Sequence, residues 1–385
     1  MKVTKLFNEF FNSERAGGIL LIFCAIISLT LTNSPIGEMY QHLWHRTIAN
    51  HSIEFWINDA LMAIFFLLVG LELEREVYMG ELSKRRQAAL PVVAALGGMI
   101  VPAGIFLLFN IGTATQAGAG IPMATDIAFA IGILSLLGKR VPVSLKVLLT
   151  ALAVIDDLGA IIVIAVFYTD TIAFANLLIS LGVLLFLFGL NRWKVYSLIP
   201  YLIGGVIAWY FMLQSGVHAT IAGVLLAVVI PFSDGQEHST SYKLQKFLHR
   251  PVAFIILPLF ALANTSLVVE PGWMQGLTLP GSIGILAGLM VGKPLGIFLF
   301  SLLAVLTGLC AKPTDLSWKH ILGIGFLGGI GFTMSIFITL LAYDQHAYIV
   351  QAKIAILLAS LISGLVGFGW LRITLFQRPQ RLTTP

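Results

Sequence analysis

Charged residues are scarce in this sequence. Asp, Glu, Lys and Arg make up 11% of the 385 residues, whereas soluble proteins carry about a quarter. Hydrophobic residues make up 58% of the chain, and the mean hydropathy is +0.94. A soluble globular protein could not bury so much apolar surface, and a disordered chain would be far more polar. The composition therefore indicates an integral membrane protein.

Cysteine is nearly absent too. The two cysteines, Cys24 and Cys310, lie in apolar stretches, where they form neither a disulfide framework nor a metal-ligand spacing. The formal net charge of +5 could indicate a nucleic-acid partner. Because the positive residues lie between the apolar runs, they favour a role in membrane topology instead, and we expect no nucleic-acid partner.

Long apolar runs occupy most of the chain. Turn residues and charges separate twelve of them, near residues 16–32, 53–71, 88–109, 121–137, 144–168, 173–190, 196–213, 217–231, 248–264, 282–305, 320–341 and 350–371. A span needs about 20 apolar residues, so twelve spans leave only short loops. We therefore expect residues 1–385 to form a single integral membrane domain. No cleavage site for a signal peptide follows the first run, so we expect a retained helix, with a short interfacial helix over residues 1–14.

The positive charges test the number of spans. With twelve helices and a cytoplasmic N-terminus, all but three of the 23 Lys and Arg residues fall on the cytoplasmic side. Arg46 and Lys353 fall outside, and Lys293 lies within an apolar run. A wrong helix count would scramble this bias, so the positive-inside rule predicts twelve transmembrane helices with both termini cytoplasmic.

Five ionisable residues lie where lipid would surround the chain. Asp156 and Asp157 are at the middle of the fifth run, Asp126 is in the fourth, Lys293 is in the tenth, and Asp59 is near the outer end of the second. Charges inside a membrane are costly, which makes each of them a candidate functional residue.

The adjacent acids Asp156 and Asp157 point about 100° apart on a helix, so they face different neighbours. Carboxyls removed from water can exchange protons near neutral pH, and their oxygens also suit a small hard cation. A site that holds either species predicts cation/proton exchange. Lys293 is the natural counter-charge for one of the two acids. Two interpretations remain open, a fixed structural pair and a pair that opens during exchange.

Two runs carry helix-breaking residues. Gly120 and Pro122 precede Thr125 and Asp126 in the fourth run, and the eleventh run carries five glycines over residues 323–331. Interrupted helices in corresponding halves indicate a transporter site. Each break would expose helix ends, whose positive partial charge Asp126 could offset and whose negative partial charge Lys293 could offset.

Seven sequence segments carry a family resemblance. They are residues 56–62 (WINDALM), 65–72 (FFLLVGLE), 124–130 (ATDIAFA), 155–160 (IDDLGA), 215–220 (SGVHAT), 292–296 (GKPLG) and 329–335 (GIGFTMS). Together they resemble the NhaA family of sodium/proton antiporters, in the same order, from about Ala16 to Arg372.

The resemblance implies an all-α polytopic membrane protein of twelve helices, with inverted repeats formed by helices 3–5 and 10–12. Helices 4 and 11 would be discontinuous and would cross at mid-membrane. It implies a secondary active transporter of the bacterial inner membrane, not an enzyme, without cofactors. Such a protein expels Na⁺ or Li⁺ in exchange for protons, electrogenically, is activated as pH rises, and works as a homodimer.

The resemblance also implies roles for residues of the central site. Asp157 would be the chief cation ligand, and Asp156 would help to bind the cation and would pair with Lys293. Thr125 and Asp126 would support the helix crossing.

Four further residues fall in regions that the family links to the pH response. Glu72 and Glu76 would lie in a cytoplasmic funnel, and His218 would influence the pH response. Relatives carry an acid where this chain has Gln245, so the pH set point is open. The external segment around residues 42–55 is short, which leaves open whether it forms the family's dimer hairpin.

Other functions would use the same residues differently. An intramembrane aspartyl protease needs its two acids on facing helices, which adjacent acids do not provide. A sodium-coupled symporter would need a site for an organic solute, of which the sequence carries no sign. A channel would not need a charge pair at broken helices.

Overall fold

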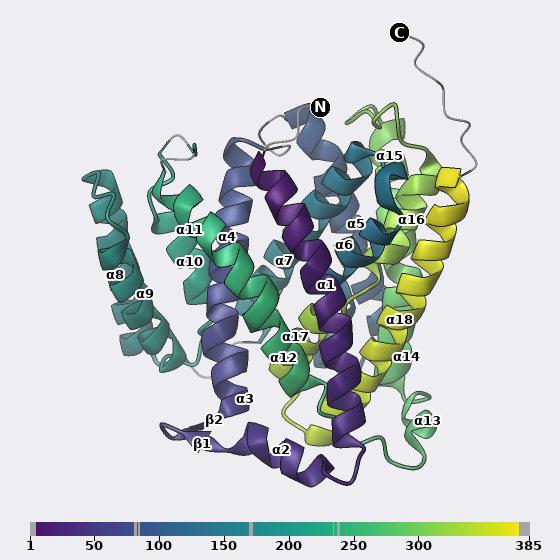
Figure 1. Ribbon diagram of the computed structural model, residues 1–385, viewed down its shortest axis with the longest axis horizontal. Helices are drawn as coiled ribbons and strands as arrows, with labels where there is room; N and C mark the ends of the chain where they lie inside the picture. Colours follow the sequence, from purple (N-terminus) through teal and green to yellow (C-terminus); the bar gives the residue numbers. More distant parts are fainter. Residues whose placement is uncertain are drawn as a thin grey trace. The chain divides into compact units, whose positions relative to one another are not determined.

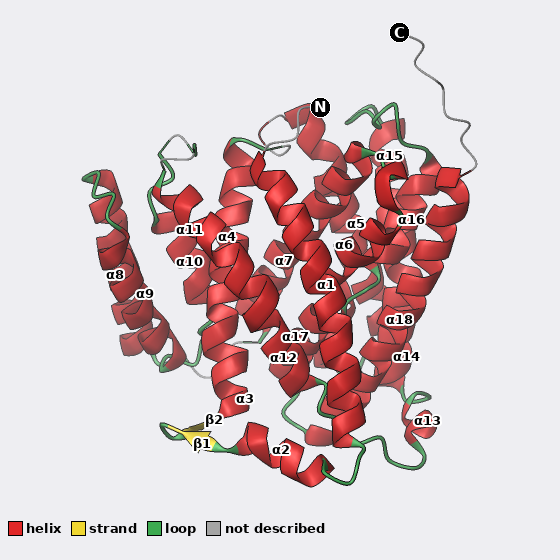
Figure 2. Ribbon diagram, in the orientation of Figure 1, coloured by secondary structure: helices red, strands yellow, loops and turns green. Residues whose placement is uncertain are grey.

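A computed structural model of the chain describes residues 5–80, 83, 85–168, 172–233, 235–236 and 239–376 (Figure 1). These residues are mostly helical, and their only strands form one small hairpin (Figure 2). The prediction of an all-α membrane protein is confirmed. The helices divide into two compact units, which are described in turn.

The first unit takes Arg85–Asp156 and Gly272–Pro385. The prefix η marks 3₁₀ and π helices. The elements in chain order are α5 (Arg85–Asn110), η3 (Gln116–Met123), α6 (Ile127–Leu136), η4 (Gly138–Arg140), the part of α7 (Val143–Phe167) up to Asp156, α13 (Trp273–Gly276), α14 (Pro280–Ala287), η6 (Gly288–Gly292), α15 (Lys293–Leu306), α16 (Trp318–Gly328), α17 (Phe332–Ala342) and α18 (His346–Phe376).

The second unit takes Thr4–Lys84 and Asp157–Pro271. Its elements are α1 (Lys5–Thr32), α2 (Gly37–His45), β1 (Thr47–Ile48), β2 (His51–Ser52), α3 (Ile53–Trp56), η1 (Ile57–Leu61), α4 (Met62–Tyr78), the remainder of α7, α8 (Phe174–Arg192), α9 (Leu198–Leu213), α10 (Ile221–Val229), α11 (Thr240–Pro251), η5 (Val252–Ile256) and α12 (Leu257–Asn264).

Small residues set the packing of the first unit. Helices α5 and α15 meet at Gly97 and Gly296, and a Cβ on Gly296 would lie 2.1 Å from the Gly97 carbonyl oxygen. Only glycine allows so close an approach, which membrane helices use in place of a hydrophobic driving force. The close contact brings the start of α15, and with it Lys293, against α5. Helices α16 and α18 also lie side by side (Figure 1).

The second unit is built from helix pairs. Helices α8 and α9 lie side by side, and α1 packs against α12, where the Ser28 hydroxyl donates to the Leu262 carbonyl at 2.6 Å (Figure 1). The hairpin β1–β2 follows α2 and turns at Ala49 and Asn50, whose φ values are 49° and 67°. Two successive left-handed residues make the tight turn that suits a two-residue hairpin loop. The short segment around residues 42–55 therefore does form a hairpin.

The apolar helices bear on the number of spans. Among the described residues, eight helices are long and apolar enough to cross a membrane, or up to ten if each of two bent pairs is one span. Two further expected runs coincide with helices shorter than 18 residues, α9 and α10. A multi-pass membrane protein is confirmed, while the count of twelve, the inverted repeats and the single domain remain predictions.

The start of the chain differs from the expectation. Helix α1 is continuous from Lys5 through the first apolar run, so the interfacial helix expected over residues 1–14 is not a separate element within the described part. Residues 1–4 lie outside the described residues.

Candidate functional site

Two interrupted helices meet in the first unit. The fourth run breaks at residues 124–126 between η3 and α6, after Pro122, and the eleventh breaks at residues 329–331, where α16 and α17 meet at a 47° bend. The Asp126 backbone N–H donates to the Ile330 carbonyl at 2.7 Å. The two breaks are therefore joined to each other, as the prediction of two discontinuous helices requires.

Asp126 serves the N-termini of both broken helices. Its Oδ1 accepts from the Phe129 backbone N–H at 2.9 Å and so caps α6. Its Oδ2 accepts from the Thr333 backbone N–H at 3.1 Å, at the start of α17, and from the Thr333 hydroxyl. A carboxylate at a helix N-terminus satisfies unpaired N–H groups and offsets the positive end of the helix dipole.

The carbonyl ends of the broken helices also have donors. At the end of η3, the Met123 carbonyl accepts from Lys293 Nζ, and the Ile121 carbonyl accepts from the Ser335 hydroxyl at 2.7 Å. The end of α16 faces Thr125, whose Oγ1 lies 2.9 Å from the Gly328 carbonyl oxygen. Cations and hydroxyl donors at C-terminal ends complement the negative end of the dipole.

A buried ion pair lies beside this crossing. Lys293 Nζ is 2.7 Å from Asp156 Oδ2, and both side chains are fully buried. Thr125 Oγ1 is 2.9 Å from the same carboxylate oxygen. The Thr125 hydroxyl carries one proton but lies within reach of two acceptors, Asp156 and Gly328, so it can donate to only one at a time.

One carboxylate oxygen of Asp156 takes no part in the ion pair. In the part of the chain that the structure describes, Asp156 Oδ1 has no hydrogen-bond partner although it is buried. A buried oxygen without a donor is costly unless a proton, a water or a cation occupies it. Asp156 can therefore take up a small ligand while Oδ2 keeps Lys293.

A π-helical turn precedes Lys293. The turn η6 spans Gly288–Gly292 and ends at Lys293. Because a π turn inserts one residue into the helix, it rotates everything that follows, and such turns are frequent at functional sites. The second unit has a similar turn, η1, which contains Asp59.

Asp157 follows Asp156 on α7 but belongs to the second unit. It is almost completely buried. Within the described residues, no three His, Cys, Asp or Glu side chains gather to hold a metal ion. Any cation bound here would have to take part of its ligands from hydroxyls, backbone carbonyls or water.

The predicted funnel acids lie on α4 in the second unit. Glu72 Oε1 is 3.4 Å from His249 Nδ1 of α11, and both side chains are largely buried. Glu76 lies one turn further along α4, and Gln245 is buried on α11, one turn before His249. The structure thus brings Glu72 together with a histidine that the sequence did not single out.

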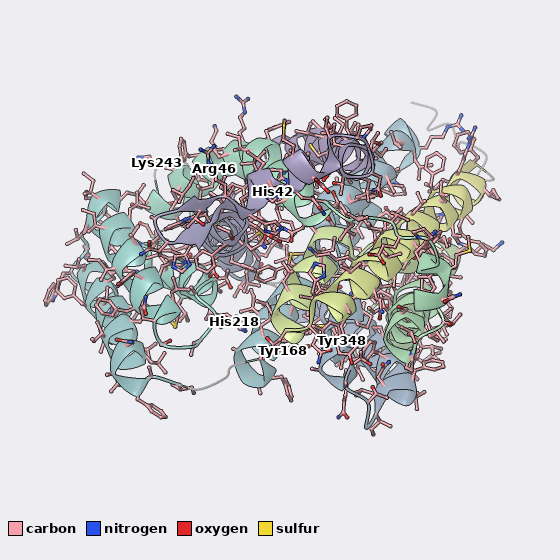
Figure 3. The ribbon with its side chains drawn as sticks, turned by 90° about the horizontal axis from the view of Figure 1, so that it is seen from below. His42, Arg46, Tyr168, His218, Lys243 and Tyr348 are labelled. Atoms are coloured by element: carbon pink, nitrogen blue, oxygen red, sulfur yellow. The ribbon has the colours of Figure 1, made fainter. Side chains whose placement is uncertain are left out.

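His218 lies between α9 and α10, just before the start of α10. Its Nε2 is 2.7 Å from the Tyr168 carbonyl oxygen at the end of α7, and Figure 3 labels both residues. The hydrogen bond ties an imidazole to the backbone. His218 belongs to the second unit, whereas Lys293 and Asp126 of the helix crossing belong to the first.

Sequence reasoning missed several contributors. Thr333 and Ser335 lie in segment 329–335, where the sequence pattern predicts no role for their hydroxyls, and no pattern singles out His249. Hydroxyls just after a helix break could have indicated capping. Glu72 and His249 lie 177 positions apart in the sequence. No local spacing pattern could therefore have predicted their contact.

Comparisons with known proteins show the family of the chain. The family model of Na⁺/H⁺ antiporter 1 matches residues 8–371. A Na⁺/H⁺ antiporter NhaA 1 of Flavobacterium johnsoniae is 66% identical over 97% of this chain and 98% of its own, and an NhaA of Flavobacterium psychrophilum is 63% identical over the same shares. The solved structure of the sodium proton antiporter MjNhaP1 from Methanocaldococcus jannaschii shares the fold, with a TM-score of 0.54, 15% identity and 100% coverage of both chains.

Proposed function

The chain belongs to the Na⁺/H⁺ antiporter 1 family, as the resemblance predicts, and from this premise we propose that it expels Na⁺ or Li⁺ from the cytoplasm in exchange for protons. The proposed protein is a secondary active transporter that supports pH and sodium homeostasis. The observation that carries the proposal is the fully buried pair of Asp156 and Lys293 at the crossing of two broken helices.

Competition for carboxylates provides the coupling. A proton and a hard cation both bind carboxylate oxygens. Because they compete for the same oxygen, binding of one excludes the other. Asp156 has one oxygen in the ion pair and one without a partner in the described structure. We assign the chief cation-ligand role to its neighbour Asp157 and a supporting role to Asp156, which pairs with Lys293.

Alternating access would complete the cycle. With the carboxylates open to the cytoplasm, Na⁺ displaces protons, and with the carboxylates open to the outside, protons displace Na⁺. A conformation that exposes the site to both sides at once would leak, so the site must open to only one side of the membrane at a time. Exchange is electrogenic if more protons than cations move in each cycle.

Activation by rising pH is part of the proposal. Glu72, Glu76 and His218 are its candidate residues, and the 3.4 Å contact between Glu72 and His249 supports a titratable cluster on α4 and α11. Loss of a proton from such a cluster would change the charge at the cytoplasmic end of these helices. Because Gln245 cannot titrate, the set point would rest on the remaining groups.

The surroundings of the protein follow from the same premise. We propose the bacterial inner membrane, with both termini cytoplasmic, and a homodimer. The hairpin Thr47–Ile48 with His51–Ser52 supports a dimer contact, since its edge strands can pair with a second copy. No cofactor is proposed, because Na⁺, Li⁺ and H⁺ are the transported substrates.

Proton movement in everted membrane vesicles tests the proposal. Respiration acidifies the vesicle interior, a pH-sensitive dye reports the gradient, and Na⁺, Li⁺ or K⁺ is then added at mildly acidic to alkaline pH. Dequenching by Na⁺ and Li⁺ but not by K⁺ is expected. Asp156→Asn and Asp157→Asn should each abolish the response while the protein stays inserted, whereas Asp344→Asn, at an exposed acid, should not.

Two results would overturn the proposal. Full activity of either Asp156→Asn or Asp157→Asn would remove the site assignment. Absence of any response from correctly inserted wild-type protein would favour a solute symporter or a protease, and solute uptake or peptide cleavage would then be measured in the same vesicles.

A further inference from the structure

The N-terminus of α17 lacks a cap of its own. The first N–H groups of any helix have no partner inside that helix, and a Ser, Thr, Asp or Asn at the preceding position usually accepts from them. The position before α17 is Gly331, which has no side chain to accept a hydrogen bond. The first bond within the helix runs from the Ser335 N–H to the Gly331 carbonyl, at 2.9 Å.

Crowding explains why glycine occupies this position. A Cβ on Gly331 would lie 2.1 Å from the Ser335 hydroxyl oxygen. That hydroxyl is already engaged, because it donates to the Ile121 carbonyl near the end of η3. A capping side chain at residue 331 would therefore disrupt the crossing, so the cap must come from another element.

Two other elements provide it. Asp126, from the fourth run, accepts from the Thr333 N–H. The Phe332 N–H instead donates to the hydroxyl oxygen of Ser360, 3.1 Å away on α18. Phe332 and Ser360 are both buried, so no water competes for this N–H.

We propose that Ser360 is a positioning residue for cation exchange: it fixes the N-terminus of α17 from α18 and so keeps Asp126 and Thr125 in place at the helix crossing. This role rests on the proposed function. It extends the exchange site to α18, a helix that contributes none of the assigned site residues.

The chain of contacts from Ser360 to the ion pair is short. Ser360 holds the Phe332 N–H, and the next residue, Thr333, donates to Asp126. Asp126 is adjacent to Thr125, whose hydroxyl contacts Asp156. Without the Ser360 acceptor, a buried N–H would be left unpaired, which costs about 1–3 kcal/mol. Expressed in cation affinity, at about 1.4 kcal/mol per factor of ten, this corresponds to a loss of about five- to 150-fold.

Ser363 offers a matched control on the same helix. It lies three positions after Ser360, it is equally buried at 2% exposure, and it borders the same break, since a Cβ on Gly329 would lie 2.9 Å from its hydroxyl oxygen. Within the described residues, however, the Ser363 hydroxyl has no hydrogen-bond partner. Ser363→Ala therefore makes the same chemical change without removing a cap.

The experiment compares purified full-length wild type, Ser360→Ala, Ser360→Cys and Ser363→Ala. Hydrogen exchange measured by mass spectrometry on peptides that cover residues 330–336 reports the cap directly. Exchange in liposomes at varied Na⁺ gives the KM for Na⁺ and the maximal rate. Cysteine nearly matches serine in size but is a weaker acceptor, so it decides the question if the alanine variant does not fold.

The expected result is faster deuterium uptake at the start of α17 and a KM for Na⁺ raised about fivefold or more in Ser360→Ala, with a smaller change of the same sign in Ser360→Cys. Ser363→Ala should match the wild type in both measurements. Equal effects of Ser360→Ala and Ser363→Ala, or no effect of either Ser360 variant, would overturn the proposal. If the wild type shows no Na⁺/H⁺ exchange, the proposed function fails, while deuterium uptake still decides whether Ser360 caps α17.

Discussion

Removal of the Lys293 charge should destabilise the protein strongly. Lys293 Nζ is 2.7 Å from Asp156 Oδ2, both side chains have no solvent exposure, and Nζ also donates to the Met123 carbonyl. Removing one partner of a buried ion pair leaves an uncompensated charge, which costs about 3–5 kcal/mol. Lys293→Ala should therefore lower the free energy of unfolding by about that amount.

Lys293→Arg should have a smaller effect because it keeps the positive charge. The Lys293 side chain has no solvent exposure, so a larger head group would have to fit into the packed interior. A guanidinium is larger than an ammonium, and overpacking a core costs about 1–3 kcal/mol. The expected order of stability is wild type, then Lys293→Arg, then Lys293→Ala, and exchange activity should follow the same order.

A double-mutant cycle isolates the ion pair from packing. Unfolding of purified protein in mixed micelles is measured for Lys293→Ala, Asp156→Asn and the double variant. The double variant removes both charges of the pair, so it should be more stable than the sum of the single effects predicts, with a coupling energy of about 2 kcal/mol or more. It should nevertheless lack exchange. Additive effects, or equal losses for the alanine and arginine variants, would refute the view that the ion pair is a charge interaction.

Three further predictions concern helix ends in the first unit. Asp126→Asn should reduce Na⁺-dependent dequenching about tenfold or more, because a carboxamide has one acceptor oxygen for two helix N-termini. A dequenching rate within twofold of wild type would contradict this capping role. Thr125→Val should lower the free energy of unfolding by about 1–3 kcal/mol, and Thr125→Ser should lower it by less, since serine keeps the hydroxyl. Denaturant titrations measure both variants, and the reverse order would contradict the role of the hydroxyl. At the start of α16, Ser317 and His320 form a reciprocal capping box. Ser317→Ala should therefore lower the free energy of unfolding by about 1 kcal/mol in the same titrations. His320→Gln keeps an acceptor, so its free energy of unfolding should stay near that of the wild type.

The sequence alone was sufficient to predict a membrane protein and its candidate site residues. Composition predicts a membrane protein because the chain has too few charged residues to form a water-exposed surface around its apolar residues. The apolar surface must therefore face lipid. The same scarcity makes Asp126, Asp156, Asp157 and Lys293 conspicuous, since every charge inside an apolar run is costly. Pro122 and the glycines of residues 323–331 predict the two helix breaks, because helix breaking is a local property of the chain.

The tertiary structure decided which of these residues meet. Adjacent acids on a helix point in different directions, so the residue pattern alone leaves open which of them faces Lys293, while the family resemblance implies Asp156. The fold places Asp156 in the ion pair. Ser360 does not stand out in the sequence, because a serine in an apolar run is ordinary; only the fold shows the N-terminus of α17 against it. Capping by a distant helix, and pairing across 137 positions of the chain as in Asp156 and Lys293, depend on how helices pack, and packing is fixed by shape complementarity among all of them rather than by any local pattern.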